Sequence, residues 1–220
     1  MLKIILSIIV SYFIGSIPFA YILGRIKSID IRRLGSGNIG ATNAFRVLGA
    51  GLGTLALALD ILKGFFTVVV VADYFMPSEG VISILALRII LGIAAVCGHN
   101  WTIFLKFKGG KGVATSLGVL IGLALGVYSL RLCLLFTVLS WLIVFFFSGF
   151  VSLASVAAAI LFPLLLIFLS GPVELIFLSI VLSVFILYRH KSNIRRLLDK
   201  KEHKFQPFNP LKNLLKSRKP

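Results

Sequence analysis

The chain is poor in charged residues, and acidic residues are the scarcest of all. Charged side chains make up 14% of its 220 residues, with 7 acids against 23 lysines and arginines. Soluble domains usually carry about 25% charged residues, and the mean hydropathy here is +1.05. This composition excludes an ordinary soluble domain and predicts an integral membrane protein with several spans.

Cysteine and histidine are also rare. Cys97 and Cys133 fall in separate predicted helices near opposite faces, so we expect no disulfide between them and no metal site. His99, His190 and His203 are not spaced as metal ligands, and we expect no cofactor. Cys97 is interpreted as a small buried hydrophobe, with an acyl-accepting nucleophile as the alternative.

Two familiar catalytic signatures are missing. The residues five positions after the three histidines are Phe104, Arg195 and Phe208, which excludes the His-x4-Asp motif of acyltransferases that use soluble donors. A Walker A loop is excluded because Leu105 stands where a glycine is needed and Gly112 stands where Ser or Thr is needed. Nucleotide hydrolysis is therefore not expected.

What the chain has instead is long apolar runs. These runs lack period-two alternation, so they predict transmembrane helices rather than a barrel. No small-x-small cleavage site follows the first run, which predicts a retained helix rather than a signal peptide. The fold expected is all-α, a single seven-helix membrane domain over residues 1–205 with a basic tail over 206–220. The predicted spans are 4–24, 53–73, 81–98, 112–128, 131–147, 151–170 and 172–189.

The bases indicate how these spans are oriented. They gather between spans one and two, before span four and after span seven, which all lie on one side if the spans alternate. The other side carries Lys3 and Arg131 against Asp73, Glu79 and Glu174. The positive-inside rule then places the N-terminus outside and the C-terminus in the cytoplasm. The net charge of +16 fits cytoplasmic loops, anionic lipid and anionic substrates better than nucleic acid.

Small residues mark span four as a packing helix. Gly118, Gly122 and Gly126 recur every four residues. Small residues at this spacing let helices approach closely, so we expect span four to lie centrally in the bundle.

Three polar segments interrupt the apolar sequence, and the first covers residues 35–46. Its glycines let backbone N–H groups approach an anion, and its hydroxyls, amides and guanidinium add hydrogen-bond donors. The segment therefore predicts a phosphate site. Its candidate residues are Ser36, Gly37, Asn38, Thr42, Asn43 and Arg46.

The second segment, residues 99–115, leads directly into span four. Its candidate phosphate-binding residues are Lys108, Gly109, Gly110 and Lys111. The free N–H groups and positive dipole end of the following helix favour an anion there. The alternative is a basic cytoplasmic loop with a tight turn.

The third segment, residues 188–196, follows span seven. His190 and Asn193 are three residues apart, so they share a face if the helix continues. The alternative is a basic flank that touches lipid headgroups. Ser152 and Ser155 begin span six, where capping or packing explains them and contact with a ligand is the other reading. Because the predicted topology places all three segments on one side, we expect a composite anion site.

Two charges lie inside predicted span two. Asp60 and Lys63 are three residues apart. Charges within a membrane are costly, so the two are expected to pair and face the bundle interior. The preferred reading is a structural ion pair, and a catalytic carboxylate is the alternative.

Taken together, these motifs resemble the PlsY family, the acyl-phosphate-dependent glycerol-3-phosphate acyltransferases of bacterial membranes. The resemblance runs from span one to about Phe205. It rests on the glycine-rich segment of 35–43 with Arg46, and on the segments over 107–115, 151–155 and 188–193.

The resemblance implies a seven-helix enzyme that transfers an acyl group from acyl phosphate to the 1-hydroxyl of glycerol 3-phosphate. Lysophosphatidate and phosphate would be the products, with membrane lipid around a monomer in the bacterial inner membrane and the site facing the cytoplasm. Ser36, His190 and Asn193 would be catalytic, and Ser155 would join the substrate-binding residues. The general base is left open between His190 and a substrate phosphate. A transporter of anions or phosphate esters is the competing class, since it would share the basic loops.

Overall fold

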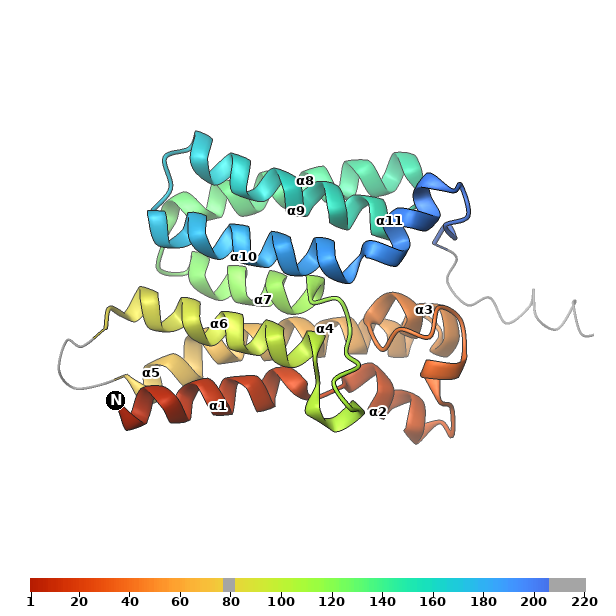
Figure 1. Ribbon diagram of the computed structural model, residues 1–220, viewed down its shortest axis with the longest axis horizontal. Coiled ribbons are helices and arrows are strands. Elements are labelled where there is room, and N and C mark those ends of the chain that lie inside the picture. Colours follow the sequence, from red (N-terminus) through yellow and green to blue (C-terminus); the bar gives the residue numbers. More distant parts are fainter. Residues whose placement is uncertain (77–81, 206–220) are drawn as a thin grey trace, which may run out of the picture.

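The computed structural model describes residues 1–76 and 82–205, and its regular elements there are all helical (Figure 1). Short turns of 3₁₀ or π helix lie at Ile31–Arg33, Thr67–Val71 and Ile103–Leu105. The all-α prediction is therefore confirmed. Glu79 and the tail over 206–220 lie outside the described residues. The α-helices are α1 (Leu2–Ser16), α2 (Phe19–Ile26), α3 (Ala41–Leu48), α4 (Ala50–Phe66), α5 (Ala72–Phe75), α6 (Ile84–Asn100), α7 (Val113–Ala124), α8 (Tyr128–Ser148), α9 (Val151–Phe168), α10 (Val173–Arg189) and α11 (Lys191–Leu198).

Four helical segments of the described chain are long and apolar enough to cross a membrane. They are Ala50–Phe75, Ile84–Leu105, Tyr128–Ser148 and Val151–Phe168. Two bent pairs raise this number to six, because α1 with α2 bends by 42° and α10 with α11 by 60°. The apolar helix α7 is shorter, and its 12 residues span about 18 Å at the usual rise. The sequence predicted seven spans. Among the described residues, four helical segments are long and apolar enough to cross a membrane, or six if each bent pair counts as one span.

Helix α7 lies in the middle of the bundle. Figure 1 shows α8, α9 and α10 on one side of it and α1, α4 and α6 on the other. A Cβ added to Gly118 would collide with the carbonyl of Ile61 on α4, and one added to Gly64 would collide with that of Thr115 on α7. Close approach of α4 and α7 therefore requires glycine on both helices, and the predicted central position of α7 is confirmed.

The first span is broken where Pro18 follows α1. Proline lacks an N–H and disfavours helix in the residue before it. At this break the carbonyl of Ile17 accepts hydrogen bonds from the Phe19 N–H at 3.2 Å and from Lys63 of α4 at 3.0 Å. The break turns α2 toward the end of the bundle where α3 and α11 also lie (Figure 1).

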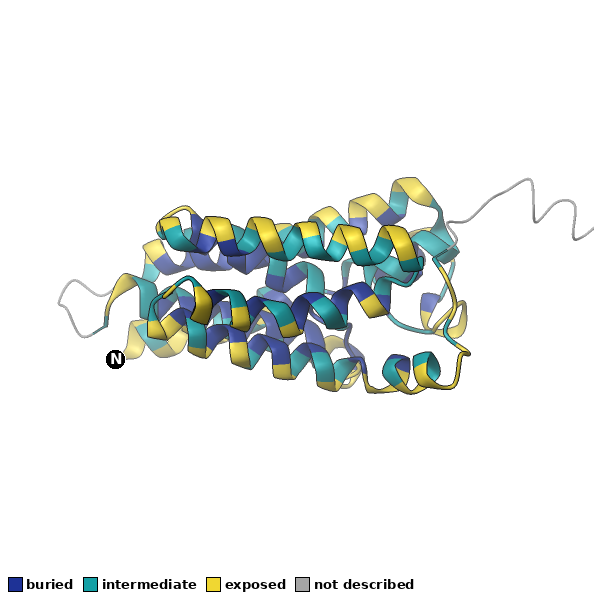
Figure 2. Ribbon diagram, turned by 90° about the horizontal axis from the view of Figure 1, so that it is seen from above, coloured by how far each residue is buried: buried dark blue, intermediate teal, exposed yellow. Residues whose placement is uncertain are grey.

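Apolar residues cover much of the outer surface as well as the core. The exposed turns of the bundle are drawn in yellow in Figure 2, and they include Phe146, Phe147 and Phe168, each more than four-fifths exposed. Such a surface suits a protein whose solvent is lipid.

Both cysteines are free thiols, as predicted.

Candidate active site

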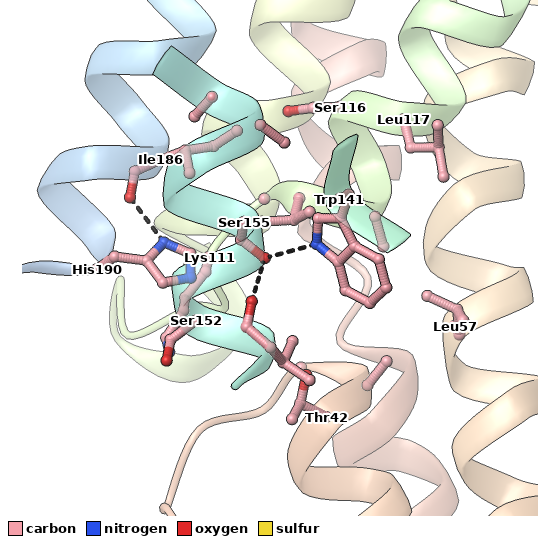
Figure 3. A pocket seen from close by; sticks show the side chains of 18 of the residues that line it. Thr42, Leu57, Lys111, Ser116, Leu117, Trp141, Ser152, Ser155, Ile186 and His190 are labelled. Atoms are coloured by element: carbon pink, nitrogen blue, oxygen red, sulfur yellow. Dashed lines mark hydrogen bonds between the residues drawn. The ribbon is translucent and has the colours of Figure 1, made fainter. Parts of the chain in front are cut away.

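The three polar segments meet at one cavity of about 720 Å³. Ser36, Thr42 and Arg46 reach it from the first segment, Lys111 from the second, and His190 from the third. These residues come from stretches far apart in the sequence. The cavity wall includes residues of α3 and α11, two helices that lie at the same end of the bundle (Figure 1). Figure 3 shows the pocket from close by. The predicted convergence of the three segments is therefore seen in the structure.

Asn43 organises the first segment. Its Nδ2 donates hydrogen bonds to the carbonyls of Ile31 and Leu34, at 3.0 and 3.1 Å. Its Oδ1 accepts one from the Ser36 N–H at 2.9 Å. Asn43 lines the cavity, but its amide is already engaged in holding the loop. This side chain therefore positions Ser36.

Glycine and a second amide shape the same loop. Gly35 and Gly37 adopt φ angles of +60° and +70°, a region that side chains disfavour. Asn38 Oδ1 accepts a hydrogen bond from the Gly40 N–H at 2.8 Å, where α3 begins. Gly37 is not part of the cavity wall, whereas Asn38 is.

Gly109 and Gly110 of the second segment are not part of the cavity wall, whereas Gly112 is. The Gly110 N–H donates to the carbonyl of His99 at 2.9 Å, and the Gly109 N–H donates to that of Asn100 at 3.2 Å. Arg189 donates to both glycine carbonyls, at 2.9 and 2.8 Å. Their backbone groups are thus used within the protein.

Lys111 is the cation that this segment presents to the cavity. Lys108 joins Gly109 and Gly110 outside the cavity wall, while Lys111 and the first residues of α7 line it. Burial lowers the pKa of Lys111 to about 8, and the carboxylate of Glu202 opposes that shift. The ammonium is consequently charged at neutral pH.

His190 sits at the junction of α10 and α11 and is nearly buried. Its Nδ1 lies 2.8 Å from the carbonyl of Ile186. A carbonyl can only accept a hydrogen bond, so Nδ1 carries the proton and the neutral ring keeps a free lone pair on Nε2. Figure 3 shows the ring beside Lys111 and Ser152.

Asn193 links Lys111 to an acid that sequence reasoning missed. Lys111 Nζ donates to Asn193 Oδ1 at 2.6 Å, and Asn193 Nδ2 donates to Glu202 Oε1 at 2.6 Å. Glu202 also accepts from Ser152 at 2.8 Å and from Arg196 at 2.7 Å. Burial raises the pKa of Glu202, but these hydrogen bonds outweigh it and lower the pKa overall. The contacts fix which way the Asn193 amide faces.

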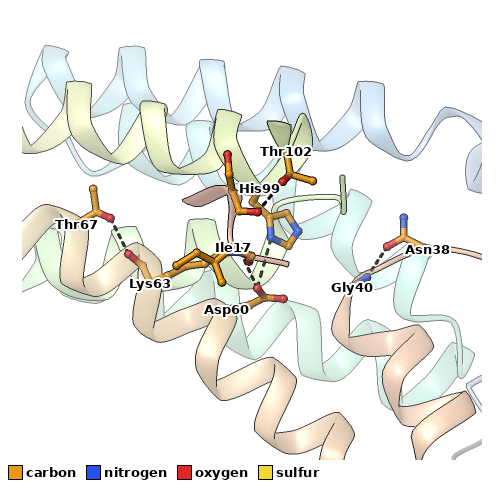
Figure 4. Close-up of polar contacts among 9 residues, drawn as sticks. Ile17, Asn38, Gly40, Asp60, Lys63, Thr67, His99 and Thr102 are labelled. Carbon is orange, nitrogen blue, oxygen red and sulfur yellow. Dashed lines mark hydrogen bonds and ion pairs between the residues drawn. The ribbon is translucent and has the colours of Figure 1, made fainter. Parts of the chain in front are cut away.

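The predicted ion pair of Asp60 and Lys63 is confirmed. Their charged atoms lie 2.8 Å apart, and both side chains are 2% exposed. His99 joins them, with Nδ1 at 3.5 Å from Asp60 Oδ1 (Figure 4). Asp60 and His99 also reach the cavity wall, a position that spacing alone did not indicate.

We call the part of the cavity lined by Arg46, Lys111 and His190 its mouth, and the rest its apolar limb. The limb is mainly apolar, although Ser116, Thr137 and Ser183 also line it. Ser155 lies at the transition, where its hydroxyl donates to the Val151 carbonyl at 2.8 Å and accepts from Trp141 at 3.1 Å (Figure 3). The apolar walls are formed by Leu57, Ile61, Leu117, Leu120, Leu134, Val138, Ala158, Ala159, Phe162, Leu182 and Ile186. A cationic mouth above an apolar limb suits a phosphate joined to an alkyl chain.

The described residues contain no group of three His, Cys, Asp or Glu side chains that could hold a metal ion. The cavity wall includes the cations Arg46, Lys111 and Arg196 and the carboxylates of Asp60 and Glu202. A bound phosphate would therefore meet more cationic than anionic side chains in the cavity wall.

The family model for glycerol-3-phosphate acyltransferase matches residues 5–200. The chain belongs to this family. It is 40% identical over 204 residues to a glycerol-3-phosphate acyltransferase of Aquifex aeolicus, which covers 93% of this chain and 100% of the relative. A Fusobacterium nucleatum relative of the same name is 42% identical over 200 residues, covering 90% and 96% of the two chains.

Solved structures of the family share the fold. The crystal structure of PlsY, an integral membrane glycerol 3-phosphate acyltransferase, in its glycerol 3-phosphate form is 39% identical, with a TM-score of 0.81. The match covers 96% of this chain and 98% of that one. The lysophosphatidic acid form gives a TM-score of 0.78. The resemblance to PlsY is thus confirmed, and this chain is an integral membrane member of the family.

Proposed function

We propose that this protein transfers a fatty acyl group from acyl phosphate to the 1-hydroxyl of sn-glycerol 3-phosphate. The observation that carries the proposal is the cavity itself, with Lys111, Arg46 and His190 at the mouth of an apolar limb. Both substrates carry phosphate, and the donor also carries an alkyl chain. Family membership supports glycerol 3-phosphate as the acceptor.

The reaction is a direct transfer. The 1-hydroxyl oxygen of glycerol 3-phosphate attacks the acyl carbonyl carbon, a new C–O ester bond forms, and the C–O bond to phosphate breaks. Phosphate leaves with the electron pair, and lysophosphatidate is the other product. Acyl phosphate is a mixed anhydride and is already activated, so the step needs no nucleophile from the enzyme.

The site residues divide this work by position. Arg46 and Lys111 hold phosphates through charge-assisted hydrogen bonds, while Ser36, Asn38 and Thr42 add neutral donors. Ser36 and nearby N–H groups polarise the carbonyl as negative charge develops on it. Holding both substrates in line contributes several kcal/mol to the rate enhancement.

Two groups can accept the proton of the attacking hydroxyl. One is His190 Nε2, which is free because Nδ1 is bound to Ile186. The other is an oxygen of the donor phosphate. Asn193 is held by Lys111 and Glu202 and orients the acceptor beside them.

The proposed setting is the bacterial plasma membrane, with seven spans, a monomeric chain and the site on the cytoplasmic side. In this arrangement α7 counts as a short span shielded by its neighbours. The basic residues of the three segments then face the cytoplasm, in keeping with the positive-inside rule. Water-soluble glycerol 3-phosphate reaches the mouth, and the acyl chain stays among apolar helices.

The donor is tested with purified protein and glycerol 3-phosphate. Palmitoyl phosphate, palmitoyl-CoA and palmitoyl-acyl carrier protein are supplied in separate reactions, and lysophosphatidate is measured. Product from palmitoyl phosphate alone supports the proposal. Product formed only from palmitoyl-CoA or palmitoyl-acyl carrier protein would show that acyl phosphate is not the donor. Uptake of glycerol 3-phosphate into proteoliposomes, without any product, would favour a transporter.

A further inference from the structure

The apolar limb of the cavity follows one face of α9. The α9 residues in its wall are Val151, Ser152, Ser155, Ala158, Ala159 and Phe162, whose spacing is that of a single helix face. From Ser155 to Phe162 the wall extends for about 10 Å at the helical rise. Leu166 continues the same face, is fully buried and takes no part in the wall. The limb therefore ends at Phe162.

On the surrounding helices, too, the residues that line the limb stop partway along the helix. The deepest wall residues are Leu120 on α7, Leu134 on α8 and Leu182 on α10. Leu120, Phe162 and Leu182 also belong to the main packed core, and Leu134 packs against it. The limb is thus closed by tightly packed side chains rather than by lipid or water.

We propose that Phe162 sets the length of the acyl chain that the protein accepts. This inference rests on the proposed function, since the chain must be attached to a phosphate held at the mouth. Lys111 and Arg46 fix one end of the donor, and the Phe162 ring blocks the other. Ala158 and Ala159, with small side chains, leave the space between open.

Size explains why Phe162 controls the limit. It is the largest side chain at the closed end and is 4% exposed, so its ring fills space that a longer chain would need. Interiors are close-packed and yield little to an extra methylene. Removing the ring opens room in line with the limb, whereas a larger residue at Ala158 would shorten it.

The test compares kcat/KM for saturated acyl phosphates of increasing chain length in wild type, Phe162→Ala and Ala158→Leu. Burying one methylene is worth about a fourfold gain. In Phe162→Ala we expect the preferred chain to lengthen by two or more methylenes. The ratio of the longer donor to the wild-type optimum should rise at least about tenfold. Ala158→Leu should shift the preference toward shorter chains.

Leu164→Ala is the matched control. Leu164 lies on the same helix but is 56% exposed on the outer face, so its truncation should leave the chain-length profile unchanged. Phe162→Leu is the milder variant if Phe162→Ala does not fold. It should give a smaller shift in the same direction.

Two results would overturn the inference. One is an unchanged profile in both Phe162→Leu and Ala158→Leu with full activity. The other is a shift on truncation of Leu142, which lines the cavity edge and is 49% exposed, without any shift at Phe162. That second result would mean that the chain leaves sideways into lipid. Failure of the proposed function is distinct, because wild-type protein would then give no product from acyl phosphate of any length.

Discussion

His190 has one ring nitrogen tied to a carbonyl and one free. The Nδ1 bond to Ile186 keeps Nε2 available as a hydrogen-bond acceptor toward the cavity. If Nε2 takes the hydroxyl proton, His190→Ala should lower kcat by about 100-fold or more. Steady-state kinetics with both substrates measures this.

The alternative at His190 has its own signature. A rise in KM with unchanged kcat would assign the ring to substrate binding and leave the proton to the donor phosphate. Asn193 neighbours His190 in the site but has no basic nitrogen, so Asn193→Ala serves as the comparison for a purely orienting role.

Lys111 predicts how activity depends on pH. Its pKa is about 8 in the free protein, so the ammonium is present below that pH and is lost as the pH rises through it. Because the substrates are anions, kcat/KM should fall by about tenfold per pH unit above 8. Lys111→Arg should move this fall to higher pH, because guanidinium stays protonated.

The control for this prediction is the kcat profile at saturating substrate. A bound phosphate restores the charge on Lys111, so kcat should change much less with pH than kcat/KM. An alkaline limb that is identical in wild type and Lys111→Arg would contradict the role given to this lysine.

The contact between α4 and α7 makes a prediction about packing. A Cβ on Gly118 would collide with the carbonyl of Ile61, a backbone atom that cannot move aside cheaply. Gly118→Ala should therefore lower the free energy of unfolding by about 1–3 kcal/mol. Thermal unfolding in a mild detergent measures this loss.

Gly51→Ala is the matched control, because Gly51 lies in α4 and a Cβ there would meet nothing within 4 Å. Alanine favours a helix over glycine by about 0.5–1 kcal/mol, so this variant should be as stable as wild type or slightly more stable. Equal losses in the two variants would show that close packing of α4 and α7 is not what glycine provides.

The topology proposed for the complete chain can be tested with reporter fusions. A reporter that folds only in the cytoplasm should be active after Phe205 and inactive after Ser170, which follows α9 at the opposite end of the bundle. The positive-inside rule is the physical reason. Activity at Ser170 and none at Phe205 would reverse the orientation and place the site outside.

The pattern of apolar runs and basic loops predicted the helical architecture and the meeting of the three polar segments at one cavity, because hydropathy and charge act locally along the chain. It also predicted the Asp60–Lys63 pair, since two charges three residues apart share a helix face. What it could not predict depends on contacts between distant segments. Arg189 binds carbonyls of Gly109 and Gly110 across about 80 residues.

Other roles were hidden by the sequence pattern itself. Asn43 looked like a substrate ligand because its amide stands among glycines, but its partners are backbone groups of its own loop. Glu202 lies in a basic stretch that is typical of the flank of a membrane span, so the sequence pattern did not indicate a role for its carboxylate. Asp199 and Glu202 are the two acids of this basic stretch, and their closeness in sequence to His190 and Asn193 was the available signal.

The most direct test of a shared three-segment site is whether phosphate release depends on the acceptor. With palmitoyl phosphate and purified protein, direct attack predicts that inorganic phosphate and lysophosphatidate form at equal rates. It also predicts almost no phosphate when glycerol 3-phosphate is absent. Rapid phosphate release without glycerol 3-phosphate, or a burst of one phosphate per protein, would instead indicate hydrolysis or an acyl-enzyme and would contradict direct transfer.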